Sequence, residues 1–340
     1  MRITRSVQRL EAYVPGEQPK SRRVVKLNTN ENPYPPSPEC AKVLKGFDLD
    51  ALRRYPDPEF AALRAAIAKR FRTTSDRVFV GNGSDEILAL SARAFVEDDE
   101  LIASLDPSYS LYKTLAAIRD VEWVGRREGM RLDPKASLFL WTNPNAPTGV
   151  LAPVDEIAAF AKSFRGVVIV DEAYADFARW NAMDLATADA NRNVIVMRTF
   201  SKSYSLAGLR VGFCVGPADL IAALYKVKDS YNVDAVAQAV ALAAFKDRAY
   251  HAKTVKAVVK TRKAFVKELE KRGWDVLPTD SNFAFAKPPA PLKAADVFRY
   301  LKSREIYVRY FPGPLTGERL RITIGTDGQM ETLLKAVDEL

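Results

Sequence analysis

The segment RTFSKSYSLAGLR, residues 198–210, follows directly on the apolar run VIVM. A second apolar run, VVIV at 167–170, leads into DEAY at 171–174. Both runs are continuous and rich in β-branched residues, which is typical of strands covered on both faces in a parallel sheet. Ligands bind at the carboxyl ends of such strands. Lys202 and Asp171 are therefore the first candidates for chemistry.

Short apolar runs recur along the first 250 residues, with amphipathic helical patterns between them. The runs predicted as strands are Val78–Val80, Leu101–Ser104, Leu138–Trp141, Val167–Val170, Val194–Met197 and Val211–Val215. A helix is expected just after Pro153, where apolar residues repeat at helical spacing. This alternation predicts a three-layer α/β domain built on a mostly parallel sheet.

The pattern changes after about residue 250, where a long amphipathic helix is expected around 255–269. The segments predicted beyond it are strands at 283–286, 306–308 and 320–323, and helices at 294–304 and from 329. They indicate a smaller α+β domain. A chain of 340 residues suits two domains. The predicted division is an N-terminal arm at 1–26, a large domain at 27–250 and a small C-terminal domain at 251–340.

The positive charge of the chain is local. Residues 1–26 carry a net charge of +5 and residues 253–272 a net charge of +6, against +9 for the whole chain. This favours a solvated tail and a solvated helix face over a nucleic-acid-binding surface. No apolar stretch suggests a membrane span or a signal peptide. Cys40 and Cys214 give no disulfide framework and no metal spacing, so the cytoplasm is the expected compartment.

Two turns rich in glycine or proline follow other predicted strands. GNGSDE at 81–86 precedes a helical run, and a glycine turn at a helix start suits a phosphate, with the Ser84 hydroxyl as a further donor. A simple helix cap by Ser84 or Asp85 explains the same segment. NPNAPTG at 143–149 forms a turn at a strand's carboxyl end, which fits a ligand site or merely a rigid turn.

The two strand-end residues suggest a specific cofactor chemistry. A buried carboxylate at Asp171 needs a partner, and a protonated pyridine nitrogen would serve, although a helix-capping role is also open. Glu172 is expected to point the other way and to be structural. Lys202, among small polar residues, can lose its proton and form a Schiff base, although most lysines are merely solvated. Ser201 and Arg210 could bind a phosphate dianion.

Taken in order, these segments resemble the fold-type I pyridoxal-phosphate aminotransferases. The resemblance begins at LNTNENPYPPSP (27–38) and RYPDPE (54–59) and ends at RLRITIGT (319–326), so it covers nearly the whole chain. The ordered set is specific, although each piece alone is not. Within the family it is most similar to the histidinol-phosphate aminotransferases. The resemblance thus implies histidine biosynthesis, with amino transfer from L-histidinol phosphate to 2-oxoglutarate.

The resemblance also implies a role for each matching residue. Lys202 matches the lysine that bonds to pyridoxal phosphate and moves protons, Asp171 the aspartate that keeps the ring nitrogen protonated, and Tyr174 the tyrosine bonded to the ring hydroxyl. The remaining matches are the ring-stacking Tyr109, the phosphate cradle of Ser84, Asp85, Ser201 and Arg210, the substrate arginines Arg309 and Arg321, Tyr13 over the substrate, and Tyr55, which reaches the neighbouring subunit's cofactor and substrate site. A homodimer with shared sites is implied.

One position departs from the family pattern. Ala146 stands where the family usually has an asparagine that bonds the ring oxygen. Asn145 and Asn143 are the candidate replacements, although neither is in register, and Asn145 is taken as a cofactor contact. His251 is the one histidine of the chain, away from these motifs, and a surface or domain-junction position is expected for it. One histidine excludes a histidine-based triad or metal site.

Other functions fit parts of the same sequence. An aromatic aminotransferase or a threonine-phosphate decarboxylase would use Lys202 and Asp171 in the same way. A non-catalytic protein that binds through its basic arm and helix is the alternative from another class. The lysine, aspartate, tyrosine and arginine set argues against it, because a pure binding protein needs no Schiff-base lysine.

Overall fold

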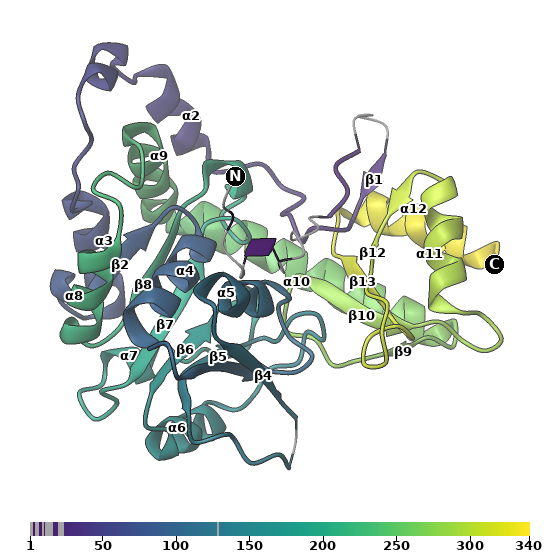
Figure 1. Ribbon diagram of the computed structural model, residues 1–340. Helices are drawn as coiled ribbons and strands as arrows, with labels where there is room; N and C mark the ends of the chain where they lie inside the picture. Colours follow the sequence, from purple (N-terminus) through teal and green to yellow (C-terminus); the bar gives the residue numbers. More distant parts are fainter. Residues whose placement is uncertain (1–2, 4–6, 9, 11–15, 20–23, 128) are drawn as a thin grey trace.

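The computed structural model describes residues 3, 7–8, 10, 16–19, 24–127 and 129–340, which form two units side by side (Figure 1). The larger unit contains a seven-stranded sheet in the order β2-β8-β7-β6-β5-β3-β4. Its strands are β2 (Val78–Gly81), β3 (Leu101–Leu105), β4 (Glu122–Arg126), β5 (Ala136–Thr142), β6 (Val167–Asp171), β7 (Val194–Thr199) and β8 (Gly212–Val215). β8 runs antiparallel to both of its neighbours and the other pairs are parallel. The predicted mostly parallel α/β sheet is confirmed.

Helices cover both faces of this sheet, which makes the three predicted layers. They are α2 (Pro38–Lys45), α3 (Ala61–Phe71), α4 (Ser84–Phe95), α5 (Leu111–Arg119), α6 (Val154–Ser163), α7 (Met183–Thr187), α8 (Ala218–Val227) and α9 (Ala235–Lys246). Within β6, Val168 and Val170 enter one apolar cluster and Ile169 enters the other. Alternate side chains of a strand point to opposite faces. An all-apolar strand such as β6 therefore requires cover on both sides.

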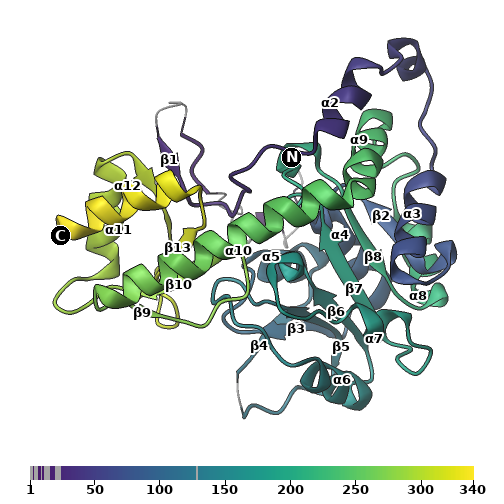
Figure 2. The same ribbon diagram turned by 180° about the vertical axis from the view of Figure 1, so that it is seen from behind.

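The smaller unit follows the long helix α10 (Arg248–Lys271), which runs along the back of both units (Figure 2). Its antiparallel sheet has the order β12-β13-β10-β9. The elements of this unit are β9 (Asp275–Val276), β10 (Phe283–Lys287), α11 (Ala294–Ser303), β11 (Ile306–Tyr307), β12 (Arg309–Tyr310), β13 (Leu320–Thr323) and α12 (Asp327–Asp338). The predicted strands and helices of the C-terminal part lie within one or two residues of these bounds, except that α10 begins earlier.

The start of the described chain returns to the smaller unit. β1 (Val25–Lys26) pairs in parallel with β11, and Leu27 packs in the C-terminal apolar cluster. The sequence placed 1–26 in an arm and 27 onward in the large domain. A pairing between positions about 280 residues apart leaves no local pattern, since it depends on how the two chain ends meet. β4 was also missed, because its residues are only partly buried at the sheet edge.

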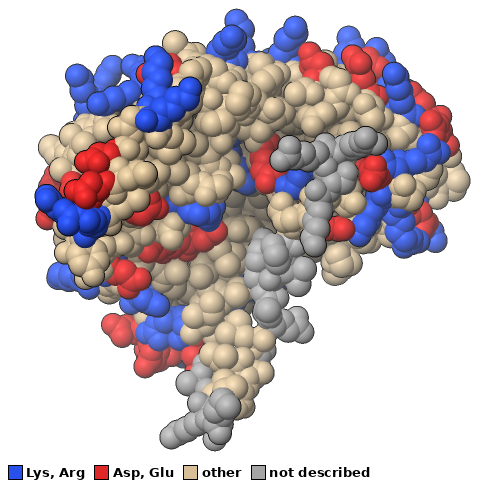
Figure 3. Space-filling model, turned by 90° about the horizontal axis from the view of Figure 1, so that it is seen from above, with Lys and Arg blue, Asp and Glu red and all other residues tan. Residues whose placement is uncertain are grey.

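Three further findings concern membrane-spanning helices, metal ligands and the distribution of surface charge. No helix in the described part of the chain is long and apolar enough to cross a membrane. No group of three or more potential metal ligands was found among the described residues. On the face seen in Figure 3, Lys and Arg are interspersed with Asp and Glu.

Candidate active site

Lys202 lies in the loop that leaves β7, at the carboxyl edge of the sheet. Its Nζ donates a hydrogen bond to the backbone oxygen of Thr29 at 3.0 Å and lies 5.9 Å from the centre of the Tyr174 ring. Burial lowers the pKa of Lys202 to about 8, and the positive charge of Arg321 acts in the same direction. A neutral amine, which is the nucleophilic and basic form, is therefore accessible near neutral pH.

Asp171 ends β6, the strand next to β7, so it and Lys202 occupy the same edge of the sheet. The carboxyl group accepts hydrogen bonds from the Tyr112 hydroxyl at 2.9 Å and from the backbone N–H of Ala173 at 3.1 Å. Burial raises the pKa of Asp171 to about 6, although both bonds favour the carboxylate. A cationic group bound against it would relieve this cost of burial.

Tyr174 lies three residues beyond Asp171 and is buried, with 8% of its surface exposed. Its ring packs edge-on against Phe283 of β10, and its hydroxyl accepts a hydrogen bond from the Asn30 amide at 2.9 Å. Tyr174 thus stands between the large sheet and the smaller unit.

The predicted phosphate cradle comes together from three segments. Arg210 donates hydrogen bonds to Asp85 at 3.1 Å and to Ser201 at 3.4 Å, and Ser84 and Asp85 open α4. Gly83 caps this helix with a φ of 80°, and a Cβ on it would lie 2.7 Å from a terminal nitrogen of Arg210. Only glycine combines this backbone with so close an approach. The helix start and the guanidinium therefore converge where an anion would bind.

The two predicted substrate arginines lie directly opposite each other on neighbouring strands. Arg309 of β12 pairs in register with Arg321 of β13, and both guanidinium groups lie over the Phe311 ring. Like charges at opposed positions repel each other. An anionic ligand between them would remove that repulsion. Arg321 also donates a hydrogen bond to the backbone oxygen of Asn28 at 3.1 Å.

In the turn after β5, the asparagine side chains form hydrogen bonds with nearby residues of the protein. The Asn145 amide donates to the backbone oxygen of Pro107 and to Thr148, and it accepts from Ser108. Asn143 bonds the backbone of Ala152 in both directions. A cofactor contact by Asn145 would require it to give up one of these bonds, so that assignment stays a prediction. Ala146 is buried against Tyr174 and Phe283.

The remaining predicted tyrosines differ in their surroundings. The Tyr109 ring meets the Tyr112 ring edge-on, and its hydroxyl donates to Asp85 at 3.4 Å, so it borders the cradle. Tyr55 is 79% exposed and stacks on Tyr231 with ring centres 4.3 Å apart. Tyr13 lies outside the described residues.

A second cluster of charges lies behind the Lys202 loop. Arg198 donates two hydrogen bonds to Glu172, at 2.8 and 3.0 Å, and one to Asp176 at 3.0 Å. The Ser203 hydroxyl also donates to Asp176, and His251 Nε2 lies 3.4 Å from it. Burial would raise the pKa of Asp176, but His251 and Arg198 lower it below its usual range. Glu172 is thus paired with Arg198 within the fold, which supports the structural role predicted for it.

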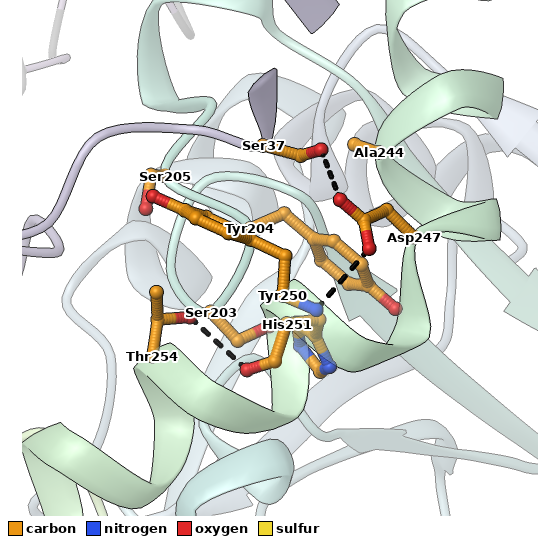
Figure 4. A pocket seen from close by; sticks show the side chains of 9 residues that line it. All are labelled: Ser37, Ser203, Tyr204, Ser205, Ala244, Asp247, Tyr250, His251 and Thr254. Atoms are coloured by element: carbon orange, nitrogen blue, oxygen red, sulfur yellow. Dashed lines mark hydrogen bonds between the residues drawn. The ribbon is translucent and has the colours of Figure 1, made fainter. Parts of the chain in front are cut away.

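His251 is therefore not at the surface. It is 8% exposed near the start of α10 and stacks on the Tyr204 ring at 4.1 Å between centres. It helps to line a small pocket that also contains Ser37, Ser203, Asp247 and Tyr250 (Figure 4). This pocket contains none of the cradle residues. The expected surface position is therefore wrong, whereas the domain-junction position stays a prediction, since Tyr204 and Asp176, which contact His251, both belong to the larger unit.

Sequence reasoning missed three buried residues around this site. Tyr112 holds Asp171 and also bonds Thr142 at 2.6 Å. Asn30 contacts Tyr174, and Thr323 of β13 contacts Asn30 at 3.0 Å. The second tyrosine of SYSLY and the asparagines of LNTNEN were visible polar residues inside matched segments. Their partners, however, lie 30 to 293 positions away.

Residues 22–337 match the model of the aminotransferase class I and II family. The chain belongs to this family. Among its curated relatives are histidinol-phosphate aminotransferase 1 of a Nostoc species, 41% identical, and histidinol-phosphate aminotransferase 2 of Dechloromonas aromatica, 42% identical. Each alignment covers 98% of this aminotransferase and 97% of the relative.

Solved structures support the fold of this aminotransferase. A histidinol-phosphate aminotransferase from Sinorhizobium meliloti, in complex with pyridoxal-5'-phosphate, superposes with a TM-score of 0.88 at 24% identity. The alignment covers 99% of this chain and 97% of that one. An L-threonine-O-3-phosphate decarboxylase from Porphyromonas gingivalis has a TM-score of 0.81 at 23% identity. At such identities the likeness establishes the fold alone, which is the predicted one.

Proposed function

We propose that this aminotransferase uses pyridoxal phosphate to move the amino group of L-histidinol phosphate to 2-oxoglutarate. One observation carries the proposal. Lys202, which can lose its proton near neutral pH, and Asp171, whose hydrogen-bond donors carry no charge, lie at the same edge of the sheet. Burial lowers the pKa of the lysine to about 8 and raises that of the aspartate to about 6. Relatives 41–43% identical over almost the whole chain are histidinol-phosphate aminotransferases, which supports histidinol phosphate as the amino donor.

The residues present fit the cofactor at three points. The cradle of Gly83, Ser84 and Arg210 suits a phosphate group, and a Cβ on Gly212 would lie 2.7 Å from the Ser84 nitrogen, so the cradle needs this glycine. Asp171 suits the ring nitrogen, and Tyr174 suits the ring hydroxyl. When bound, pyridoxal phosphate supplies an aldehyde for condensation with amines and a ring that withdraws electrons.

The side chains of this protein then divide the work. Lys202 is the amine that holds the cofactor and the base that moves the substrate's α proton, because its lowered pKa leaves it partly neutral. Asp171 keeps the facing ring nitrogen cationic. Arg309 and Arg321 orient the anionic group of the substrate through charge-assisted hydrogen bonds. The paired, buried strands β6 and β7 keep Asp171 and the start of the Lys202 loop fixed relative to each other.

The absorbance spectrum of the purified protein with pyridoxal phosphate tests this proposal. Glutamate is expected to change the spectrum of the bound cofactor, and imidazole-acetol phosphate to reverse the change. Phenylalanine and threonine phosphate serve as comparison substrates, with carbon dioxide release measured for the latter. A spectrum that ignores both glutamate and imidazole-acetol phosphate would refute the assignment. A faster response to phenylalanine, or carbon dioxide release, would move it to another substrate.

We further propose a homodimer with shared sites. Large apolar side chains are exposed along the projecting segment at the upper left of Figure 1: Leu44 is 54%, Leu49 74%, Leu52 53% and Tyr55 79% exposed. Several large apolar side chains exposed along one short segment favour a protein interface there. Tyr55 lies at its end, where it would reach the site of a second copy.

Mixed subunits test whether the sites are shared. Tyr55→Phe and Lys202→Ala are each expected to lower activity strongly. In a hybrid dimer with shared sites, one site would hold both defects and the other neither, so mixing the two variants restores activity. Independent sites would each keep one defect, and mixing would then restore nothing.

We also propose the cytoplasm as the compartment, which the two buried free cysteines support. Cell fractionation tests it.

A further inference from the structure

Asn30 connects the smaller unit to Tyr174. It is 1% exposed and has a φ of 56°, a left-handed conformation that asparagine adopts more readily than most residues. Its backbone N–H donates to the Thr323 hydroxyl at 3.0 Å, and its backbone oxygen accepts from the Asn282 amide at 3.0 Å. Thr323 and Asn282 both belong to the smaller unit. They therefore hold Asn30 in one place and one orientation.

The direction of each hydrogen bond in this chain follows from the groups involved. The backbone N–H of Asn30 can only donate, so Thr323 Oγ1 accepts there and donates its own hydrogen to Asn30 Oδ1 at 3.0 Å. Asn30 Nδ2 is then the atom that faces the Tyr174 hydroxyl, at 2.9 Å. Turning the amide over would cost Thr323, which is buried, the acceptor of its hydrogen.

An amide nitrogen can only donate, so the Tyr174 oxygen accepts from Asn30. The phenolic hydrogen therefore points away from Asn30 and is directed to another acceptor. We propose that Asn30, oriented by Thr323, is a positioning residue that fixes Tyr174 as a hydrogen-bond donor to the ring oxygen of bound pyridoxal phosphate. This inference rests on the proposed function.

Ala146 makes the contact between Asn30 and Tyr174 more important for orienting the phenol. The side chain of Ala146 contacts Tyr174 and offers no hydrogen-bonding group, so it neither competes for the phenol nor orients it. Asn30 approaches the same tyrosine from the smaller unit. The strength of the bond to the ring oxygen therefore depends on contacts that reach across both units, and not on the turn after β5.

Two substitutions at one position separate positioning from structural support. Asn30→Asp keeps the shape of the side chain but replaces the donor with an acceptor, which would draw the phenolic hydrogen to itself. Asn30→Gly removes the side chain, keeps both backbone bonds and suits the positive φ. We expect cofactor affinity to fall about tenfold in Asn30→Asp and about threefold in Asn30→Gly, since a charge-assisted bond is lost or loosened. The absorbance spectrum of the bound cofactor should shift in the same order.

Asn282→Ala is the matched control, because it removes one buried bond to Asn30 without changing the polarity of the amide. The two bonds between Thr323 and Asn30 remain and still fix the amide, so cofactor affinity is expected to stay within about twofold of the wild type. In a Tyr174→Phe background, the Asp and Gly variants should also differ by less than about twofold. Thermal unfolding of each variant checks that it folds.

The outcomes separate two failures. A wild-type protein that does not bind pyridoxal phosphate would refute the proposed function. If the wild type binds it, a loss in Asn30→Gly equal to or larger than that in Asn30→Asp would show plain structural support and overturn the inference. An Asp effect that persists in Tyr174→Phe would trace to the added charge and overturn it as well.

Discussion

Asp171 and Glu172 are adjacent carboxylates at the end of the buried strand β6, but they differ in the groups that surround them. Both are almost fully buried, at 4% and 2% exposed, and burial raises the pKa of each. Arg198 of the next strand opposes this effect at Glu172 through two hydrogen bonds. The groups that oppose it at Asp171 are a phenol and a backbone N–H, which carry no charge.

The difference lies in where the counter-ion comes from. Glu172 finds its cation within the fold, so its charge helps to hold β6, β7 and the Lys202 loop together. Under the proposed function Asp171 receives its cation from the bound cofactor, and the cofactor-free protein bears the cost of burying the carboxylate. We therefore expect changes on the Asp171 side to affect chemistry and changes on the Glu172 side to affect stability.

Lys202→Ala should have the largest effect on the chemical side. It removes the amine that we propose bonds to the cofactor, so activity should fall by at least about 10⁴-fold, and borohydride should trap no cofactor on the protein. The unfolding temperature should hardly change. The lowered pKa of Lys202 means that the fold disfavours its charged form, so the loss of that charge should not destabilise the protein. Lys162→Ala, an exposed lysine on α6, is the control and should keep full activity.

Asp171→Asn should lower activity by roughly 10³-fold while it stabilises the protein without cofactor. The native carboxyl group binds its proton more tightly than in the unfolded chain, with a pKa of about 6 against 3.8. Native stability is therefore lost as pH rises from about 4 to 6. The neutral amide escapes this loss, so the gain should be on the order of 1–3 kcal/mol at pH 7.

Denaturant unfolding of the cofactor-free Asp171→Asn protein at pH 4 and pH 7 measures this gain, which should be nearly absent at pH 4. Equal stability of variant and wild type at pH 7 would mean that the charge of Asp171 is compensated within the protein, and the contrast with Glu172 would fail.

Glu172→Gln should act mainly on stability. It leaves Arg198 buried with Asp176 as its remaining carboxylate, so unfolding should require about 2–4 kcal/mol less free energy. Activity per folded molecule should stay within a few-fold. Glu156→Gln, on the exposed side of α6, is the control and should change stability by less than about 0.5 kcal/mol. A loss of activity without a loss of stability would place Glu172 in the reaction.

Tyr112→Phe should have the smallest effect. It removes one hydrogen bond that favours the carboxylate of Asp171, so the pKa of Asp171 rises further and cofactor binding weakens by about tenfold. Affinity measured at pH 6 and pH 8 checks this. The defect should be larger at pH 6, where more of the variant carries a protonated Asp171. A defect independent of pH would indicate lost packing instead.

Much of this architecture could be predicted from the sequence. The continuous β-branched runs at 167–170 and 194–197 require cover on both faces, and this local property fixed the layers and the sheet edge. Lys202 and Asp171 follow those runs directly, so their approach needed only the parallel pairing of two strands. The edge strand β4 and the pairing of β1 with β11 were missed, because neither has a continuous apolar run.

What the tertiary structure decided is which polar groups have partners. Glu172 and Asp171 look alike in DEAY, and only the side chain of Arg198 separates a structural carboxylate from a candidate cofactor ligand. His251 became buried through its contacts with Tyr204 and Asp176, and Asn30 reached Tyr174 through contacts between the two units. The spacing of apolar residues is a local property of the sequence, so the sequence alone determines the layers and the strand ends. Hydrogen bonds and burial join distant residues, so only the folded chain determines charge state and orientation.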